Sequence, residues 1–282
     1  MDKRACAYSS HRFSSFVQQE LDLSGFNMAN PLPLKDRVIL ITGAAQGIGE
    51  ATARYLAARG ATLSLSDISG EKLQAAGQRI AELFPESQVM TTLVDICNPK
   101  SVEEWVARAK AEFGRIDGCV NSAGIVGKDP SPITELDFDQ WNSTINVNLT
   151  GMFNCLKYEL RAIGDGGSIV NIGSIAGQHG LNFYPAYTAS KHGVIGLSKT
   201  AATESANRGI RVNVVCPAFT DTPMCAQVYG QSDESIRVEN LPQLFHRLVE
   251  PEEVAGLISY LLSDESRFIT KSVYPISGGF GV

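Results

Sequence analysis

Apolar residues in this chain fall into short runs that alternate with longer stretches of helical periodicity. Short apolar runs are typical of buried strands, and the amphipathic stretches between them are typical of helices. The predicted strands occupy residues 37–42, 61–66, 88–94, 118–120, 168–172, 211–216 and 272–276. The predicted helices occupy residues 50–59, 69–83, 101–113, 137–163, 184–207 and 251–262. This alternation predicts one α/β domain, a doubly wound, Rossmann-like parallel β-sheet of about seven strands with helices on both faces.

Two segments depart from the alternation. Residues 1–34 mix Ser, Gln and charged residues with isolated aromatic ones, and Pro31-Leu32-Pro33 lies at their end. They are interpreted as an N-terminal extension, poorly ordered or docked on the domain, which then covers residues 35–282. Residues 219–250 show no regular periodicity. A connection of this length in a compact domain is typical of a lid or a substrate-binding segment.

Composition narrows the possible partners. The net charge is −6 and the pI about 5.3, so the chain has no basic character suited to nucleic acid or an anionic membrane. No apolar run reaches the ~18 residues of a membrane span, and no apolar signal-peptide core stands at the N-terminus. The six cysteines are scattered without a C-x-x-C pair. This indicates reduced thiols in a cytoplasmic protein, with no metal site expected.

A glycine-rich turn follows the first predicted strand and has the sequence Gly43-Ala44-Ala45-Gln46-Gly47-Ile48-Gly49. A turn between a strand and a helix start presents free N–H groups and the positive end of the helix dipole, which together can bind a pyrophosphate. The same glycines could serve only as a tight connection. Asp67 ends the second predicted strand, where a carboxylate can accept both ribose hydroxyls of an adenosine and repel a 2′-phosphate. Asp67 could also cap the helix that follows.

Ser174, Tyr187 and Lys191 are the candidate catalytic residues. Ser174 lies just after a predicted strand, and Tyr187 and Lys191 are four positions apart on one face of a predicted helix. An ammonium group beside a phenol favours the phenolate and lowers its pKa from ~10, which suits acid/base chemistry. The Ser174 hydroxyl could then hold a substrate oxygen. Taken alone, Tyr-x-x-x-Lys is more often a solvated pair on an exposed helix.

These features belong to a longer ordered set of motifs. The set consists of Thr42-Gly43-x3-Gly47-Ile48-Gly49, Asp67, Asp95-Ile96, Asn121-Ser122-Ala123-Gly124, Asn148, Ser174, Tyr187-x3-Lys191, Pro217 and Ser277-Gly278-Gly279. It resembles the short-chain dehydrogenase/reductase family, and the resemblance covers roughly Leu34 to the C-terminus. The spacing of Ser174 and Tyr187, 13 positions, also matches that family.

The resemblance implies roles for the matched positions. Tyr187 would be the general acid/base, and Ser174 would orient the substrate oxygen. Lys191 would lower the pKa of Tyr187 and bind the nicotinamide ribose, and Asn148 would hold a water behind Lys191. The implied NAD-binding residues are Gly43, Gln46, Gly47, Ile48, Gly49, Asp67, Ile68, Asp95, Ile96, Asn121, Ala123, Gly124, Tyr187, Lys191, Pro217, Ala218, Thr220 and Thr222. The family also implies a homo-oligomer, a dimer or a tetramer, built through the helices 137–163 and 184–207.

The resulting prediction is an NAD(H)-dependent oxidoreductase that interconverts a secondary alcohol and a ketone by hydride transfer. The alternative is a dinucleotide-binding scaffold with a non-redox or regulatory role. Such a scaffold would not need the four catalytic candidates Ser174, Tyr187, Lys191 and Asn148 together. The expected substrate pocket is largely apolar and is formed by Ile125, Val126, Gln178, His179, Leu181, Phe183, Tyr184, Phe219, Met224, Val228 and Tyr229. It suits a medium-sized, uncharged cyclic or terpenoid-like small molecule. The candidate contacts are Gln178, His179, Tyr184 and Met224, although His179 could equally bond backbone and Met224 could be lid core.

Overall fold

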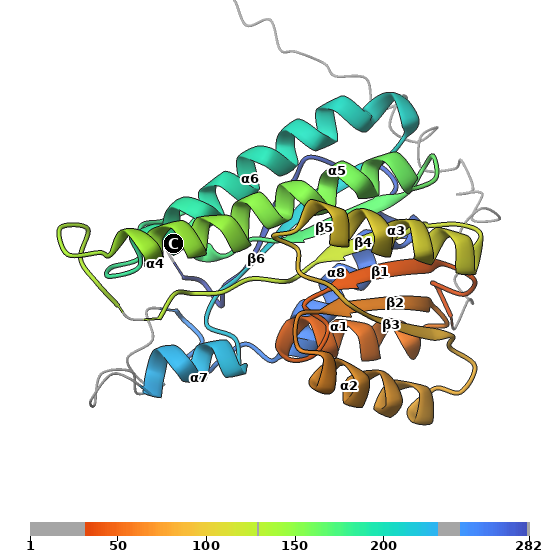
Figure 1. Ribbon diagram of the computed structural model, residues 1–282, viewed down its shortest axis with the longest axis horizontal. Helices are drawn as coiled ribbons and strands as arrows, with labels where there is room; N and C mark the ends of the chain where they lie inside the picture. Colours follow the sequence, from red (N-terminus) through yellow and green to blue (C-terminus); the bar gives the residue numbers. More distant parts are fainter. Residues whose placement is uncertain (1–31, 129, 231–242, 281–282) are drawn as a thin grey trace, which may run out of the picture. The chain divides into compact units, whose positions relative to one another are not determined.

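The computed structural model describes residues 32–128, 130–230 and 243–280, so the predicted N-terminal extension lies almost wholly outside the described residues. Seven parallel strands form one sheet in the order β3-β2-β1-β4-β5-β6-β7 (Figure 1). The strands are β1 (Val38–Thr42), β2 (Thr62–Asp67), β3 (Val89–Leu93), β4 (Gly118–Asn121), β5 (Ser168–Ile172), β6 (Arg211–Pro217) and β7 (Val273–Ile276). The predicted doubly wound parallel sheet is therefore confirmed.

The strand order reverses between β1 and β4. From β1 the chain moves outward to β2 and β3, and it then returns to build β4 to β7 on the other side. The connection after β1 leads toward the β3 edge of the sheet, and the connection after β4 leads toward the β7 edge. Because the two connections diverge, a crevice opens beyond the carboxyl ends of β1 and β4. Residues that follow these strands are thereby brought to one edge of the sheet.

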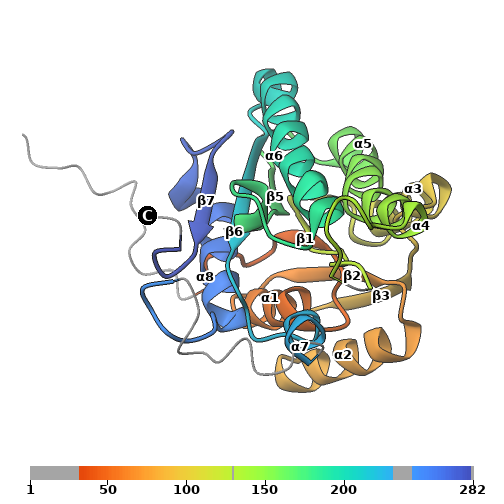
Figure 2. The ribbon, with the colours of Figure 1, turned by 90° about the vertical axis from the view of Figure 1, so that its left-hand side faces the viewer.

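Helices cover both faces of the sheet (Figures 1 and 2). One layer contains α1 (Gly47–Ala57), α2 (Gly70–Leu83) and α8 (Pro251–Leu262), and the other contains α3 (Pro99–Phe113), α5 (Met152–Ala162) and α6 (Pro185–Ser205). Each layer buries its own apolar cluster against the strands. All residues of β1, β4 and β5 are buried, as expected for strands covered on both faces.

Local signals fix several helix ends. The side chain of Asn98 accepts hydrogen bonds from the N–H groups of Lys100 and Ser101, and Pro99 occupies the first helical position of α3. Gly114 ends this helix in the left-handed region, with φ of 76°. The Asp137 side chain caps α4 (Phe138–Ile145) in the same way as Asn98 caps α3.

The prediction of a single helix over residues 137–163 is wrong in one respect. A π-helical turn, Asn146–Gly151, separates α4 from α5. A π-turn lengthens the hydrogen-bonded ring by one residue, and such turns are frequent at functional sites. Apolar periodicity does not reveal a single inserted residue, so the sequence pattern continued through it.

The segment predicted as irregular also contains a helix, α7 (Pro223–Gly230). The Thr222 hydroxyl accepts a hydrogen bond of 3.3 Å from the Cys225 N–H, and Pro223 follows at the first helical position. Thr followed by Pro is a helix-start signal that was present in the sequence. Farther along, a parallel bridge joins Thr220 to Val249. Residues 231–242 lie outside the described residues.

Candidate active site

A cavity of about 470 Å³ lies beyond the carboxyl ends of the strands. Its lining includes most of the predicted site residues: Gly43, Gln46, Gly47, Ile48, Asp67, Ile68, Asp95, Ile96, Ala123, Gly124, Ser174, Tyr184, Tyr187, Lys191, Pro217, Ala218, Thr220, Thr222 and Met224. Five predicted residues do not line it, namely Gly49, Asn121, Asn148, Gln178 and His179. The topology therefore gathers residues from positions 43 to 224 into one crevice.

The glycine-rich turn brings backbone close to this cavity. Gly43 and Gly47 have φ of 67° and 60°, a region in which side chains are disfavoured. A Cβ on Gly43 would lie 2.7 Å from the Ala123 nitrogen. Gly47 opens α1, and the N-cap residue Gln46 makes no side-chain cap hydrogen bond. A bare helix N-terminus in a glycine cradle is suited to hold the pyrophosphate of a dinucleotide.

Gly49 has a packing role. A Cβ at this position would lie 2.1 Å from the carbonyl oxygen of Gly43, inside any allowed contact. Gly49 therefore allows α1 to pack closely on the turn, rather than lining the cavity as predicted.

Asp67 is oriented by two backbone donors. Its Oδ2 accepts a hydrogen bond of 3.1 Å from the Ala45 N–H, and its Oδ1 accepts one of 2.9 Å from the Ser69 N–H. The α2 N-cap is Ser69, so Asp67 is not the cap. The carboxylate is thus held at the cavity end that is also lined by Ile68 and Lys72.

Ser174, Tyr187 and Lys191 converge at the other end of the cavity. Ser174 follows β5, and its hydroxyl hydrogen-bonds the Tyr187 side chain. The Lys191 ammonium lies 5.6 Å from the centre of the Tyr187 ring. Lys191 is only 5% exposed and donates a hydrogen bond of 2.9 Å to the Ile172 carbonyl. A phenol, a hydroxyl and an ammonium group thus face one space.

The pKa values of this group differ from the prediction. Burial raises the pKa of Tyr187 above its ordinary value, the hydrogen bond from Ser174 lowers it, and nearby Cys216 and Cys225 raise it further. Burial lowers the pKa of Lys191 to about 8. Burial is the largest cause of the rise, because it disfavours the charged phenolate, and Ser174 acts in the opposite direction. The pKa of Tyr187 is therefore raised, where the sequence analysis expected Lys191 to lower it.

Asn148 lies in the π-turn behind Lys191. Its Oδ1 accepts a hydrogen bond of 2.8 Å from the Ile125 N–H, and its Nδ2 donates to the Ile125 carbonyl at 2.8 Å and to the Ser190 hydroxyl at 3.0 Å. A Cβ built on Gly124 would lie 3.1 Å from the Asn148 Oδ1 and 3.7 Å from the Lys191 Nζ. Asn148 therefore fastens the 124–125 segment next to Lys191.

Comparison with known proteins agrees with this geometry. Residues 43–281 match the family described as enoyl-(acyl carrier protein) reductase. The short-chain dehydrogenase/reductase ABA4 of Pyricularia oryzae is 39% identical over 264 residues, which cover 92% of this chain and 97% of ABA4. The chain belongs to the short-chain dehydrogenase/reductase family.

Other members of the family are similar in sequence or structure. The cyclohexanol dehydrogenase of an Acinetobacter species is 38% identical over 247 residues, covering 87% of this chain and 95% of that protein. The crystal structure of a levodione reductase superposes with a TM-score of 0.81 at 36% identity, covering 87% of this chain and 97% of the other. A polyketide ketoreductase with NADPH gives a TM-score of 0.81 at 32% identity, with coverages of 88% and 99%. This chain is accordingly an oxidoreductase that binds a nicotinamide dinucleotide.

Asn121 occupies a different place from the one expected of a cofactor residue. It is 1% exposed, and its Nδ2 donates to Glu159 Oε2 at 2.8 Å and to Asn171 Oδ1 at 2.9 Å. Its side chain points into the layer between the sheet and α5, because alternate strand positions face opposite sides. The neighbouring Ser122, Ala123 and Gly124 line the cavity.

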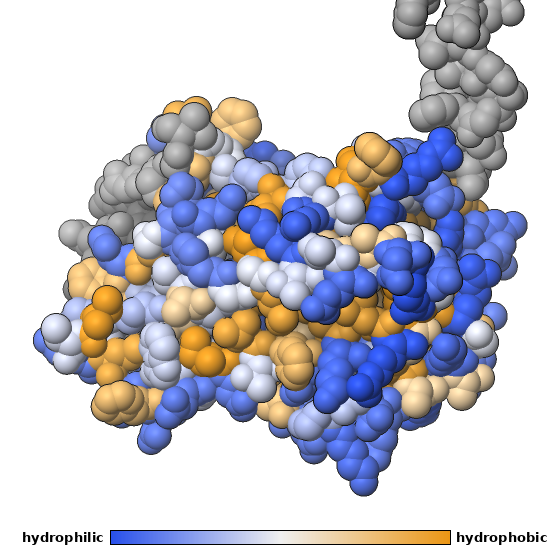
Figure 3. Space-filling model, turned by 90° about the horizontal axis from the view of Figure 1, so that it is seen from above, coloured by the Kyte–Doolittle hydropathy of each residue, from blue (hydrophilic) through white to orange (hydrophobic). Residues whose placement is uncertain are grey.

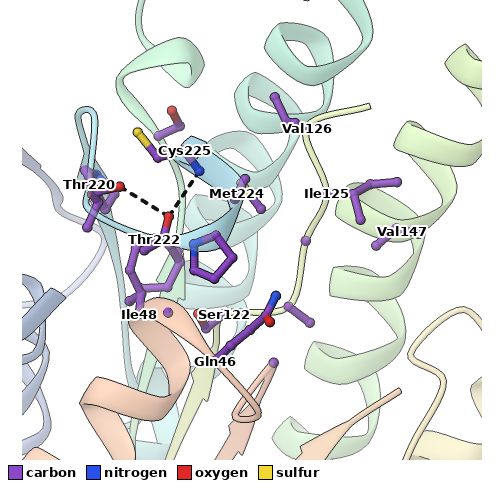
Figure 4. A pocket seen from close by; sticks show the side chains of 18 of the residues that line it. Gln46, Ile48, Ser122, Ile125, Val126, Val147, Thr220, Thr222, Met224 and Cys225 are labelled. Atoms are coloured by element: carbon purple, nitrogen blue, oxygen red, sulfur yellow. Dashed lines mark hydrogen bonds between the residues drawn. The ribbon is translucent and has the colours of Figure 1, made fainter. Parts of the chain in front are cut away.

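The substrate part of the cavity has two apolar walls (Figure 4). One wall is α7 with Met224, and the other contains Ile125, Val126 and Val147. Gln227 of α7 donates a hydrogen bond of 3.1 Å to the Gly127 carbonyl and so joins the two walls. The residues Leu181, Tyr184, Phe219 and Val228 also line this cavity, as predicted for the pocket.

The predicted contacts at Gln178 and His179 are not supported. Both residues are exposed and neither lines the cavity. The His179 ring instead contacts the Phe280 ring edge-on, with centroids 5.8 Å apart. Both residues follow a short helical turn, Ile175–Gly177, of which Ile175 and Ala176 still line the cavity. Phe183 is 56% exposed and also lies outside the lining, and the Tyr229 side chain is not described.

The sequence analysis did not single out several of the lining residues, among them Lys72, Val147 and Cys225. Val147 could have been found, because it directly precedes the matched Asn148. Lys72 and Cys225 stand outside every matched motif and carried no signal. In the described part of the chain, no cluster of three or more His, Cys, Asp or Glu side chains is placed to hold a metal ion. None of the helices described there is long and apolar enough to cross a membrane.

Proposed function

We propose that this protein is an NAD(H)-dependent enzyme that interconverts a secondary alcohol and a ketone, with Tyr187 as general acid/base. The observation that carries the proposal is the convergence of the Tyr187 phenol, the Ser174 hydroxyl and the Lys191 ammonium at one end of the cavity. A purely structural scaffold does not require a buried lysine beside a buried phenol, since both groups lose hydration there.

The chain's own residues account for the proton part of the reaction. The bound dinucleotide supplies the group that accepts or donates the hydride. Ser174 holds the substrate oxygen by a hydrogen bond, and the Tyr187 hydroxyl exchanges the proton with that oxygen. Lys191 places a positive charge beside the developing phenolate, in a site where burial strengthens the interaction. Gly124 lies next to the Lys191 ammonium, and Asn148 fastens the following residue, Ile125, by two hydrogen bonds.

Replacing Tyr187 by Phe tests this assignment. The variant keeps the ring and loses the hydroxyl, so we expect a decrease in kcat of about 10²–10⁴-fold, the usual contribution of general acid/base catalysis. The dissociation constant for the cofactor, measured by calorimetry, should change little. Turnover that survives the substitution with bound cofactor would favour the alternative, a dinucleotide-binding scaffold.

The preference for NAD(H) is proposed from Asp67. Its carboxylate faces the cavity and is fixed by the N–H groups of Ala45 and Ser69, so it cannot turn away without losing two hydrogen bonds. A fixed negative charge accepts ribose hydroxyls and repels a phosphate. We expect kcat/KM to be at least about tenfold higher with NAD than with NADP, which corresponds to ~1.4 kcal/mol. The same measurement on Asp67→Ser should show a smaller difference.

The proposed substrate is a medium-sized, mostly apolar, cyclic alcohol or ketone. The walls at Met224, Ile125 and Val147 offer apolar surface, and Ser174 and Tyr187 supply polar groups at the proposed reaction site. The name of the related cyclohexanol dehydrogenase is consistent with a ring substrate. A panel of alicyclic, terpenoid and sugar alcohols, monitored by NADH formation, tests the proposal. Activity confined to sugars or charged alcohols would contradict it.

A homo-oligomer, dimer or tetramer, is proposed on the helix layer. Phe138, Trp141 and Phe153 of α4 and α5 are 82%, 37% and 48% exposed. In the view from above, apolar areas of the molecular surface are mixed with polar ones (Figure 3). Large exposed aromatic residues are more typical of an interface than of a solvated surface. Light scattering coupled to size exclusion measures the mass, and a monomer would contradict this part.

A further inference from the structure

A lysine that no matched motif contains faces the Asp67 end of the cavity. Lys72 lies in the first turn of α2 and lines the cavity together with Ile68 and Ser69. Its Nζ donates a hydrogen bond of 3.1 Å to the Gln46 Oε1, which also faces the cavity. Lys72 is exposed, and this hydrogen bond directs its ammonium toward the glycine-rich turn.

Lys72 and Asp67 contact consecutive residues of that turn. The Asp67 carboxylate accepts a hydrogen bond from the Ala45 N–H, while the Lys72 ammonium bonds the side chain of the next residue, Gln46. The two opposite charges are thus held against the same short segment. They flank the region where Asp67 would meet an adenosine ribose.

The described residues contribute four charged side chains to the cavity lining. Two are basic, Lys191 and Lys72, and two are acidic, Asp67 and Asp95. Lys191 is buried at the Tyr187 end. Among the residues that the structure describes, Lys72 is consequently the basic lining residue at the Asp67 end, where a phosphate on the ribose would need a cation. A phosphate monoester is close to a dianion at neutral pH and pairs strongly with ammonium groups.

We infer that Lys72 is a contact for a ribose 2′-phosphate, so that the opposing charges of Asp67 and Lys72 set cofactor selection together. The inference rests on the proposed function, in which Asp67 repels NADP. In this view Asp67 favours NAD and Lys72 maintains a residual affinity for NADP. Gln46 holds the ammonium in reach by its hydrogen bond. The choice of cofactor then depends on the charges at positions 67 and 72. If the Asp67 charge alone is removed, Lys72 remains in place to bind the 2′-phosphate.

Calorimetric titration with NADP⁺ and NAD⁺ tests the inference without measuring turnover. The comparison uses Asp67→Ser, Asp67→Ser with Lys72→Gln, and Asp67→Ser with Lys157→Gln. Lys157 lies on α5, is exposed and does not line the cavity, so its replacement removes the same charge elsewhere. We expect Lys72→Gln to weaken NADP⁺ binding by about tenfold or more, as for a charge-assisted hydrogen bond, and NAD⁺ binding by less than about threefold. The effect should shrink at high salt, and Lys157→Gln should have none.

Two results would overturn the role of Lys72. One is an equal weakening of both cofactors by Lys72→Gln, and the other is no weakening of NADP⁺. Failure of the proposed function gives a different result, namely a wild-type protein that binds NADP⁺ as tightly as NAD⁺. In that case Lys72→Gln is compared with the wild type. Weaker binding of NADP⁺ alone supports the role of Lys72, and equal weakening of both cofactors, or no weakening of NADP⁺, contradicts it.

Discussion

The Lys191 ammonium donates a hydrogen bond to the Ile172 carbonyl at 2.9 Å, and so joins α6, which carries Tyr187, to the end of β5, which leads to Ser174. Two of the proposed catalytic groups are therefore positioned by the third. The relation explains why a lysine is retained in a site where burial lowers its pKa to about 8. It also means that substitutions at Lys191 affect both charge and geometry.

Lys191→Met should abolish most activity. The variant removes the positive charge beside the phenol and leaves the Ile172 carbonyl without its donor. We expect kcat to fall by about 10²–10⁴-fold, similar to loss of the acid/base group itself. Steady-state kinetics measures the effect, and circular dichroism controls for folding. Lys199→Met, an exposed lysine two turns farther along α6, is the matched control and should retain full activity.

The rate of alcohol oxidation should increase as the pH rises into the alkaline range. Oxidation requires Tyr187 to accept a proton, and its pKa is raised above the ordinary value by burial. The fraction of phenolate therefore grows as pH rises, and kcat for oxidation should rise with it, while ketone reduction should not. Ser174→Ala removes the hydrogen bond that lowers this pKa, so its profile should move to higher pH. A profile that does not move would contradict the Ser174 contact.

Asn148→Ala should loosen the 124–125 segment. It removes three hydrogen bonds, two to Ile125 and one to Ser190, and leaves buried groups unpaired. We expect a loss of about 1–3 kcal/mol in the free energy of unfolding and weaker cofactor binding. Denaturant titration and calorimetry measure both. Asn142→Ala, at an exposed position of α4, is the control and should change neither quantity.

Gly49→Ala should be strongly destabilising. The new Cβ would lie 2.1 Å from the Gly43 carbonyl oxygen, so α1 or the turn must shift. We expect a loss of about 1–3 kcal/mol or more, as for overpacking in a rigid core, together with loss of cofactor binding. Gly196→Ala in α6 is the control, because nothing lies within 4 Å of its added Cβ. Unchanged thermal stability of Gly49→Ala would contradict this prediction, because it would mean that the glycine-rich turn can shift to accommodate the added Cβ.

Buried Glu159 should make stability depend on pH. Burial raises its pKa from 4.5 to about 7, while hydrogen bonds from Asn121 and Cys119 act in the opposite direction. The folded state then binds more protons than the unfolded state between these values, so stability falls as pH rises from about 4.5 to 7. The full contribution is about 3 kcal/mol, from 1.36 kcal/mol for each pH unit. Glu159→Gln should remove this dependence in denaturant titrations at several pH values, and an unchanged slope would contradict it.

The sheet and its parallel direction could be predicted because they follow from local patterns, and much of the cavity lining because the ordered motifs resemble those of a known family. Strand and helix periods differ, and residues after parallel strands meet at one edge. The direction of the Asn121 side chain could not be predicted, because its partner Glu159 is 38 positions away and in no recognised motif. Gln178 and His179 are exposed and lie outside the described lining, a placement that the composition of the 175–184 segment does not express. The rise in the pKa of Tyr187 depends on enclosure, which no spacing of residues expresses.

The π-helical turn Asn146–Gly151 has a consequence for the surface as well as for Asn148. One additional residue rotates everything after it by about 100° around the helix axis relative to an uninterrupted α-helix. Residues of α4 and α5 that a helical wheel would place on one stripe therefore point in different directions. Deleting one residue between Asn146 and Gly151 would realign the two halves and, in the same step, turn Asn148 away from Ile125. The directions of the exposed side chains of α5 and of the Asn148 side chain therefore depend on the same inserted residue. A change that alters one of these directions also alters the other.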